Sequence, residues 1–317
     1  MKVLANDGIS QSGKEKLEAA GFEVDTTKVA QEQLVDHINE NKVNVLLVRS
    51  ATKVRQDLID GTIDNLKFIG RGGVGMDNID VDYAREKGLI VQNTPAASTR
   101  SVAELVFAHL SGMVRFLHDA NRQMPLEGET KFKQLKKNYS GGIELKGKTI
   151  GIIGFGRIGQ EVAKIAFGYG MDVKAVDPNV DEANIELDFF NGQKVSFTVK
   201  PESMESVLGA SDFISIHVAG AGQALIGAKE IDKMKDLAAV VNTSRGGVVD
   251  EEALLDALNE GKLRYAALDV FVNEPSPAMK VLMNHHLSLS PHIGAATLEA
   301  QDRIGVELAD HIIEKLG

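Results

Sequence analysis

One glycine pattern constrains the local fold more than any other feature of the sequence, and it lies in GIIGFGRIGQEVAKIAFGYGMDVKAVDP at residues 151–178. Gly154, Gly156 and Gly159 form GxGxxG directly after an apolar run and at the start of a segment with helical periodicity. The three glycines would permit a tight turn, a close backbone approach and close packing of a helix on a strand. This stretch therefore predicts a βαβ unit of a parallel sheet.

The same stretch predicts a bound dinucleotide. Backbone N–H groups at the start of the helix and the positive end of its dipole would face a pyrophosphate. Asp177 follows the second strand, where a carboxylate can accept hydrogen bonds from a ribose and repel a 2′-phosphate. The predicted cofactor is NAD rather than NADP; the alternative is a glycine-rich turn without a ligand. The predicted contacts here are Gly154, Gly156, Arg157, Ile158, Gly159 and Asp177.

Apolar runs and amphipathic segments alternate along the chain in two series, which is typical of βαβ units. A chain of 317 residues is long for one core but suits two domains. A long helix is predicted from Ser98 through residue 124, and a final helix over 297–317 could cross back to the first half. We predict an α/β protein with two Rossmann-like, doubly wound parallel-sheet domains. The discontinuous, flavodoxin-like domain covers 1–98 and 287–317, and the domain with the glycine pattern covers 99–286.

The segment NIELDFFNGQKVSFTV alternates apolar and polar residues on both sides of Asn191-Gly192. Such alternation around Asn-Gly predicts a β-hairpin over 185–199. The alternative is a loop that alternates by chance, and neither version suggests a function.

Composition excludes several classes of protein. A formal net charge of -10 argues against general binding to nucleic acid or anionic lipid. The absence of Cys removes disulfides and thiolate metal sites, and no metal site is predicted. No apolar run is long enough to span a bilayer, and the amino terminus does not resemble a signal peptide. We therefore expect a cytoplasmic protein without a membrane partner.

Three later motifs follow predicted strands, at the edge where an open α/β sheet binds ligands. They are NTSRGGVVDEEAL with Arg245, ALDVFVNEP with Asp269 and Glu274, and SPHIGAAT with His292. Taken singly, each residue also has an ordinary explanation: a surface ion pair for the arginine, a turn for the glutamate and a core position for the histidine.

Together with GFGRIG, RGGVGMDNID and SVAELVFAHL, these motifs resemble the D-isomer-specific 2-hydroxyacid dehydrogenase family over essentially the whole chain. The resemblance implies a substrate domain, a nucleotide domain and catalysis between them. It implies that Arg245, Glu274 and His292 are catalytic, and that Thr243 and Asp269 contact the cofactor.

The chemistry of these residue types fits the implied roles. Oxidation of a 2-hydroxy acid removes a hydride from carbon and a proton from oxygen, so a base such as His292 is required. Glu274 would orient the imidazole and favour its charged form. Arg245 offers a forked, permanently charged donor that matches a carboxylate.

A basic cluster suggests the substrate. RSATKVR contains Arg49, Lys53 and Arg55, and Arg71 ends a second predicted strand. The arginines at 49 and 71 would lie at the ligand-binding edge, whereas Lys53 and Arg55 are better explained as solvated helix residues. The stretch resembles the D-3-phosphoglycerate dehydrogenase branch of the family, which implies substrate contacts from Arg49, Ser50, Arg71, Gly73 and Arg245. This predicts NAD-dependent oxidation of D-3-phosphoglycerate to 3-phosphohydroxypyruvate, a step of serine biosynthesis.

Other readings remain open. A hydroxypyruvate or glyoxylate reductase of the same family would share the catalytic residues, and an NAD-sensing binding protein like the related corepressors would use the nucleotide site for regulation. Formate dehydrogenases of related fold have Gln in place of Glu274, so the glutamate argues against that activity.

The sequence departs from the family pattern at Val218 and in the loop that follows, so cofactor contacts over 218–227 are not predicted. The chain ends soon after the last helix, so no carboxyl-terminal effector domain is expected. The apolar helix from Ser98 suggests a homodimer.

Overall fold

The computed structural model describes every residue of the chain except residue 221 and divides into two compact units. Unit 1 contains Met1–Ser101 and Ala295–Gly317, and unit 2 contains Val102–Gly294. The chain returns from unit 2 to unit 1 at Ala295, eight residues after the return at residue 287 that the sequence predicted. The reason is that β13 (Leu287–Leu289) pairs in parallel with β12 (Leu263–Leu268) and completes the sheet of unit 2.

Unit 1 is built on a five-stranded parallel sheet with the order β2-β1-β3-β4-β5. This is the flavodoxin-like order of a doubly wound sheet, as predicted. Its strands are β1 (Lys2–Ala5), β2 (Glu23–Asp25), β3 (Val45–Val48), β4 (Phe68–Arg71) and β5 (Ile90–Asn93). Its helices are α1 (Gln11–Ala19), α2 (Leu34–Asn41), α3 (Gln56–Thr62), α4 (Val81–Glu86) and α12 (Leu298–Leu316), with a short 3₁₀ turn at Gln31–Gln33.

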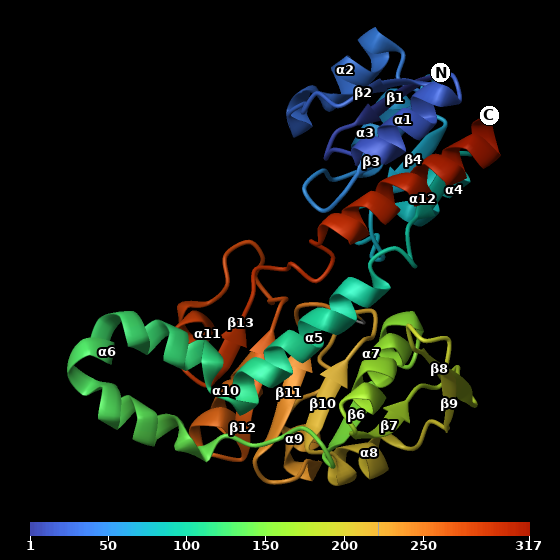
Figure 1. Ribbon diagram of the computed structural model, residues 1–317. Helices are drawn as coiled ribbons and strands as arrows, with labels where there is room; N and C mark the ends of the chain where they lie inside the picture. Colours follow the sequence, from blue (N-terminus) through green and yellow to red (C-terminus); the bar gives the residue numbers. More distant parts are fainter. Residues whose placement is uncertain (221) are drawn as a thin grey trace. The chain divides into compact units, whose positions relative to one another are not determined.

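The central strands β1 and β3 of unit 1 are apolar on both faces, because helices cover both. Val3 packs in a core beneath α1 and α12, whereas its neighbour Leu4 points to the opposite core beneath α2, α3 and α4. Helix α12, from the end of the chain, lies directly beside α1 (Figure 1). The close approach requires glycine: a Cβ on Gly13 would meet the backbone of Gly305 at 2.5 Å.

Unit 2 is built on a six-stranded parallel sheet with the order β13-β12-β11-β10-β6-β7. Its remaining strands are β6 (Thr149–Ile153), β7 (Asp172–Val176), β10 (Phe213–Ile216) and β11 (Ala238–Asn242). Its helices are α5 (Thr99–Val114), which begins in unit 1, α6 (Leu117–Asn138), α7 (Arg157–Gly168), α8 (Met204–Ala210), α9 (Ala228–Lys233), α10 (Glu251–Asn259) and α11 (Met279–Leu282), with a 3₁₀ turn at Tyr139–Gly141.

The order of the strands creates a switch point in unit 2. From β6 the chain adds β7 on one side and later returns to add β10 on the other. The loops at the carboxyl ends of two such strands diverge and leave a crevice, which is where doubly wound sheets bind dinucleotides. Helices α5 and α7 cover one face, while α8, α9 and α10 cover the other.

The predicted long helix from Ser98 is interrupted. Helix α5 ends at Val114, and Phe116 adopts a left-handed conformation with φ 57° before α6 begins. The ring of Phe116 packs edge-on against Tyr265, with 5.8 Å between centroids. Tertiary packing of this aromatic side chain therefore accompanies the break, which helical periodicity alone does not reveal.

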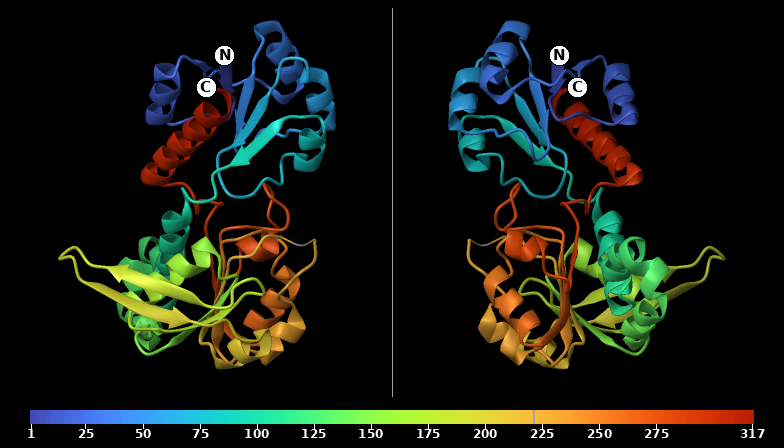
Figure 2. Two further views of the ribbon diagram at one scale, coloured as in Figure 1. Left: turned by 90° about the vertical axis from the view of Figure 1, so that its right-hand side faces the viewer. Right: turned by 90° about the vertical axis from the view of Figure 1, so that its left-hand side faces the viewer.

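The predicted hairpin is confirmed as β8 (Ala183–Asp188) paired antiparallel with β9 (Lys194–Val199). Phe189 N–H donates to the Gln193 carbonyl at 2.9 Å, and Gly192 adopts φ 85°. The turn is thus a three-residue loop in which glycine supplies the left-handed position. Figure 2 shows the hairpin, in yellow, extending beyond the neighbouring strands of unit 2.

Candidate active site

The glycine turn follows β6 directly and has the geometry of a phosphate-binding loop. Gly154 has φ 91°, and a Cβ there would meet the His217 carbonyl oxygen at 2.4 Å. A Cβ on Gly159 would meet the Gly154 carbonyl oxygen at 2.2 Å, so the helix could not pack against the turn with any larger residue. Gly156, in contrast, faces open space. The turn is therefore closed on the protein side and open on the side where a pyrophosphate would approach.

Asp177 lies beside this turn at the carboxyl end of β7. Its carboxylate accepts hydrogen bonds from the N–H groups of Phe155 at 2.7 Å and Asn179 at 2.9 Å. Arg157 and Ile158 form the first turn of α7. These residues fit a dinucleotide, because an acceptor flanks an open glycine turn at the start of a helix.

A further observation comes from the end of β11. The hydroxyl oxygen of Thr243 is buried and has no hydrogen-bond partner among the residues that the structure describes. Buried polar atoms normally have partners, so a bound polar ligand would satisfy it.

His292 and Glu274 form a pair. The imidazole Nδ1 lies 2.9 Å from Oε2 of Glu274, whose Oε1 accepts the Phe271 N–H at 2.9 Å. The pair is partly exposed, with 46% and 36% of the two side chains accessible. Because the carboxylate can only accept when ionised, Nδ1 carries the proton, and Nε2 is left to exchange a proton with a substrate.

Asp269 holds the loop that carries His292. It is 1% exposed and follows β12. Its carboxylate accepts hydrogen bonds from the N–H groups of Ile293 at 2.8 Å and Gly294 at 2.9 Å, and from the Ser290 hydroxyl at 2.6 Å. His292 itself has φ 54°, an uncommon conformation for a non-glycine residue. The two N–H groups that bind Asp269 follow His292 immediately, so this carboxylate fixes the backbone beside the strained residue.

Arg245 lies on the neighbouring loop after β11. Its guanidinium Nη1 donates to the Ser244 carbonyl at 2.7 Å, and its own carbonyl accepts from Asn242 at 2.9 Å. A Cβ on Gly246 would meet the Phe271 carbonyl oxygen at 1.9 Å, so the loops after β11 and β12 are in backbone contact. The predicted cofactor-binding and catalytic residues thus gather at the carboxyl edge of the sheet of unit 2, which includes His292 although the predicted domain boundary placed it in the other domain. A cavity of about 430 Å³ lies against the Glu274–His292 pair, with Phe271 among its walls.

The predicted anion-binding residues lie at the carboxyl edge of the other sheet, in unit 1. Arg49 follows β3 and Arg71 ends β4. Burial lowers the pKa of Arg49, although the charge of Asp7 opposes this effect. Gly73 has φ 140°, and a Cβ there would collide with the Arg71 guanidinium at 1.6 Å. Ser50 is exposed on the loop after Arg49.

Two side chains that we did not predict fix this loop. Asp7 accepts the N–H groups of Arg49 at 2.7 Å and Thr52 at 3.0 Å, while the Asn78 side chain donates to the carbonyls of the same two residues at 2.7 and 2.6 Å. Each of these two residues is thereby held at both its N–H group and its carbonyl group. Asn78 was visible in the RGGVGMDNID motif, but its partners are distant in sequence.

The ordinary explanation of the remaining basic residues is supported. Lys53 is exposed. Arg55 pairs with Asp80 at 2.7 Å near the start of α3, with both side chains partly exposed. Its charge therefore has a partner on its own unit.

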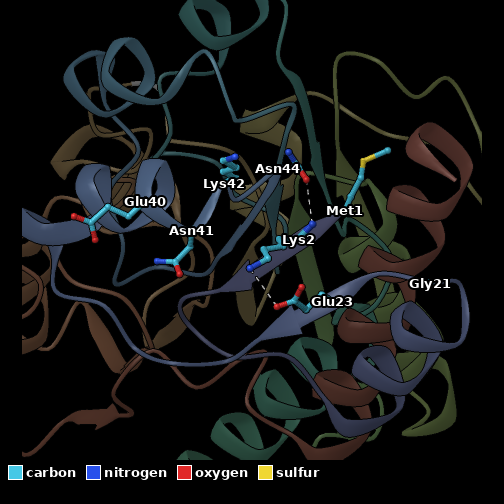
Figure 3. A pocket seen from close by; sticks show the side chains of 8 residues that line it. All are labelled: Met1, Lys2, Gly21, Glu23, Glu40, Asn41, Lys42 and Asn44. Atoms are coloured by element: carbon cyan, nitrogen blue, oxygen red, sulfur yellow. Dashed lines mark hydrogen bonds and ion pairs between the residues drawn. The ribbon is translucent and has the colours of Figure 1, made fainter.

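Another cavity, of about 460 Å³, lies in unit 1 among residues that include Lys2, Glu23, Lys42 and Asn44 (Figure 3). Lys2 pairs with Glu23 at 3.3 Å, and its N–H donates to Asn44 at 3.0 Å. These residues lie at or next to the amino-terminal ends of strands, opposite the edge that carries the predicted residues. No predicted site residue lines this cavity.

The fold and the glycine turn define a dinucleotide-binding α/β protein, and comparisons identify its family. Residues 107–294 match the family model of the D-isomer specific 2-hydroxyacid dehydrogenase, NAD binding domain. The chain is 41% identical over 322 residues to the hydroxypyruvate reductase of Thermotoga maritima, covering 100% of this chain and 98% of that one. It is 40% identical over 315 residues to the D-3-phosphoglycerate dehydrogenase of Methanocaldococcus jannaschii, covering 98% of this chain and 57% of that one.

Among solved structures, a glyoxylate reductase from Paecilomyes thermophila matches with a TM-score of 0.81 and 29% identity, over 99% of this chain and 95% of that one. The chain belongs to the D-isomer specific 2-hydroxyacid dehydrogenase family and is an NAD-dependent oxidoreductase. It spans little more than half of the length of its phosphoglycerate dehydrogenase relative. Among the described helices, none is sufficiently long and apolar to cross a membrane.

Proposed function

We propose that the protein oxidises D-3-phosphoglycerate to 3-phosphohydroxypyruvate with NAD. The observation that carries this proposal is the pair of arginines, Arg49 and Arg71, at the carboxyl edge of the unit 1 sheet. A doubly charged phosphate favours guanidinium groups because they form charge-assisted, forked hydrogen bonds. The loop clamp by Asp7 and Asn78 supports it, since a preorganised loop loses less entropy when it binds an anion. Ser50 and Gly73 complete the proposed phosphate contacts.

The proposed catalytic steps follow from unit 2. Arg245 binds the substrate carboxylate. His292 Nε2 accepts the proton of the C2 hydroxyl, and Glu274 stabilises the resulting imidazolium through the hydrogen bond at Nδ1. Bound NAD supplies the acceptor for the hydride that leaves C2. In the reducing direction His292 returns the proton to the carbonyl oxygen.

The proposed cofactor contacts are the residues at the switch point. The N–H groups of the turn from Gly154 to Gly159 would bind the pyrophosphate. Asp177 would bind the ribose hydroxyls, and Thr243 and Asp269 would lie near the nicotinamide end. The buried Thr243 hydroxyl, which has no partner among the described residues, supports this assignment.

The experiment is NADH oxidation with 3-phosphohydroxypyruvate, hydroxypyruvate and glyoxylate. We expect the phosphorylated acid to be preferred. In Arg49→Ala its KM should rise by about 10- to 100-fold, because a charged hydrogen bond contributes roughly 1.5–3 kcal/mol. Arg55→Ala is the matched control, since it removes a nearby guanidinium that pairs with Asp80.

A second candidate is hydroxypyruvate reduction, favoured by the Thermotoga maritima relative, whose length the chain covers almost completely. It would share His292, Glu274 and Arg245. Preference of the wild-type protein for hydroxypyruvate, with no change in Arg49→Ala, would support this candidate and refute the first.

We also propose a homodimer formed through α6. The apolar residues of α5, such as Val106 and Leu110, are buried within unit 2 and need no second copy, contrary to our reasoning from the sequence. On α6, however, Leu117, Leu126 and Phe132 are 64%, 78% and 57% exposed. Large apolar side chains that a helix leaves exposed favour an interface there. Light scattering should give a dimer mass, and Leu126→Glu should shift it towards the monomer; a wild-type monomer would refute the proposal.

A further inference from the structure

A buried histidine lies behind the loop that carries His292. His109, on α5, is 7% exposed. Its Nδ1 lies 2.8 Å from the Ser288 hydroxyl and its Nε2 lies 2.9 Å from the Ser290 hydroxyl. The two serines are two residues apart, on β13 and directly after it, so they face the same side. One imidazole therefore connects a helix to the end of the edge strand.

The protons of this network can be assigned from its far end. Ser290 donates its single hydroxyl proton to the Asp269 carboxylate at 2.6 Å. The Ser290 oxygen must then accept from His109, so Nε2 carries a proton. Burial lowers the pKa of His109, although the charge of Asp269 opposes this. In the neutral ring Nδ1 is an acceptor and receives the Ser288 hydroxyl proton. The three hydrogen bonds that link Ser288, His109, Ser290 and Asp269 thus all donate in the same direction, towards Asp269.

The network ends at the group that fixes His292. Asp269 also accepts the N–H groups of Ile293 and Gly294. We infer that His109 is a positioning residue for His292: it orients the Ser290 hydroxyl towards Asp269, and this holds the backbone that places the imidazole of His292. The inference rests on the proposed role of His292 but not on the identity of the substrate.

A purely packing role would not require these contacts. An apolar residue of similar size at position 109 would fill the helix–strand interface, but it would leave both serine hydroxyls without their buried partner. Ser290 would then be free to rotate away from Asp269, and a polar network with one member missing loses more than a single bond. Glutamine differs, because its amide can donate to one serine and accept from the other in the same sense.

The test compares His109→Leu with His109→Gln on whichever 2-oxo acid the wild-type protein reduces best. We expect kcat in His109→Leu to fall by about 10- to 100-fold, the range expected from a displacement of about 1 Å at the reacting group. The KM for NADH should stay unchanged, and His109→Gln should restore most of kcat. A loss of equal size in both variants, or wild-type kcat in His109→Leu, would overturn the inference.

A readout independent of turnover separates this inference from the proposed function. In ¹⁵N-histidine-labelled protein, the signals of His109 should show a neutral ring protonated at Nε2, and the ring signals of His292 should shift in His109→Leu but not in His109→Gln. An Nδ1-protonated His109, or His292 signals that are the same in all three proteins, would refute the positioning role even if no acid is turned over. Failure of the phosphate proposal would instead appear in the substrate preference of the wild-type protein and in the Arg49→Ala comparison.

Discussion

The clamp on the Arg49–Thr52 loop allows a prediction with a magnitude. Asn78→Ala removes two hydrogen bonds, at 2.7 and 2.6 Å, to the carbonyls of Arg49 and Thr52. At about 1 kcal/mol net for each bond, the free energy of unfolding of unit 1 should fall by about 2 kcal/mol. If phosphate binding has to restore the loop, the same 2 kcal/mol appears as a rise in KM of up to about 30-fold.

The assay measures KM for 3-phosphohydroxypyruvate and for hydroxypyruvate in the same variant. Only the phosphorylated acid should be affected, because only its phosphate is proposed to reach the loop. Asn39→Ala is the control: its side chain also makes two hydrogen bonds, one to the Gly61 carbonyl and one from Asn65, but none to this loop. The reasoning fails if Asn78→Ala leaves both KM values unchanged or raises them equally.

Three further predictions concern stability and cofactor choice. Gly13→Ala should lower the free energy of unfolding by about 2 kcal/mol, because the new Cβ meets the Gly305 backbone at 2.5 Å. The overpacking cost of about 3 kcal/mol exceeds the gain in helix propensity of about 1 kcal/mol. Gly112→Ala in α5, where a Cβ would meet nothing within 4 Å, is the control and should be neutral or stabilising when both variants are unfolded in urea. Burial lowers the pKa of His217 to about 3, so below about pH 6.5 the unfolded state binds the extra proton and stability falls with decreasing pH. In urea unfolding, the free energy of unfolding of the wild-type protein should be about 2 kcal/mol lower at pH 5 than at pH 7, and this difference should be absent in His217→Gln. Asp177→Ser should raise the ratio of kcat/KM with NADPH to kcat/KM with NADH by about tenfold or more, which corresponds to about 1.4 kcal/mol. An unchanged ratio would argue against ribose recognition by this carboxylate.

The sequence predicted those features whose causes are local. The glycine turn could be predicted because each of its glycines meets a steric condition within a few residues, and the hairpin because Gly192 supplies a left-handed turn position. The pairing of Glu274 with His292 was expected from the family resemblance rather than from spacing, and the structure brings the two side chains to 2.9 Å.

Features that depend on distant partners were not predicted. The break at Phe116 accompanies packing on Tyr265, far along the chain. The crossing back to unit 1 was placed too early because nothing in a three-residue strand reveals which sheet it joins. The clamp by Asn78 and the network of His109 join residues whose sequence separation hides their contact, although the alternating serines of LSLSP mark one polar face of the edge strand.

The close contact at Gly246 has a consequence for how this protein can change. The loop that presents Arg245 and the loop that leads from Asp269 to Glu274 touch through their backbones, with no room for a Cβ at Gly246. Neither loop can be lengthened, shifted or transplanted alone without displacing the other. Mutational libraries that aim at new substrates should therefore vary the two loops together and leave Gly246, where they touch, unchanged.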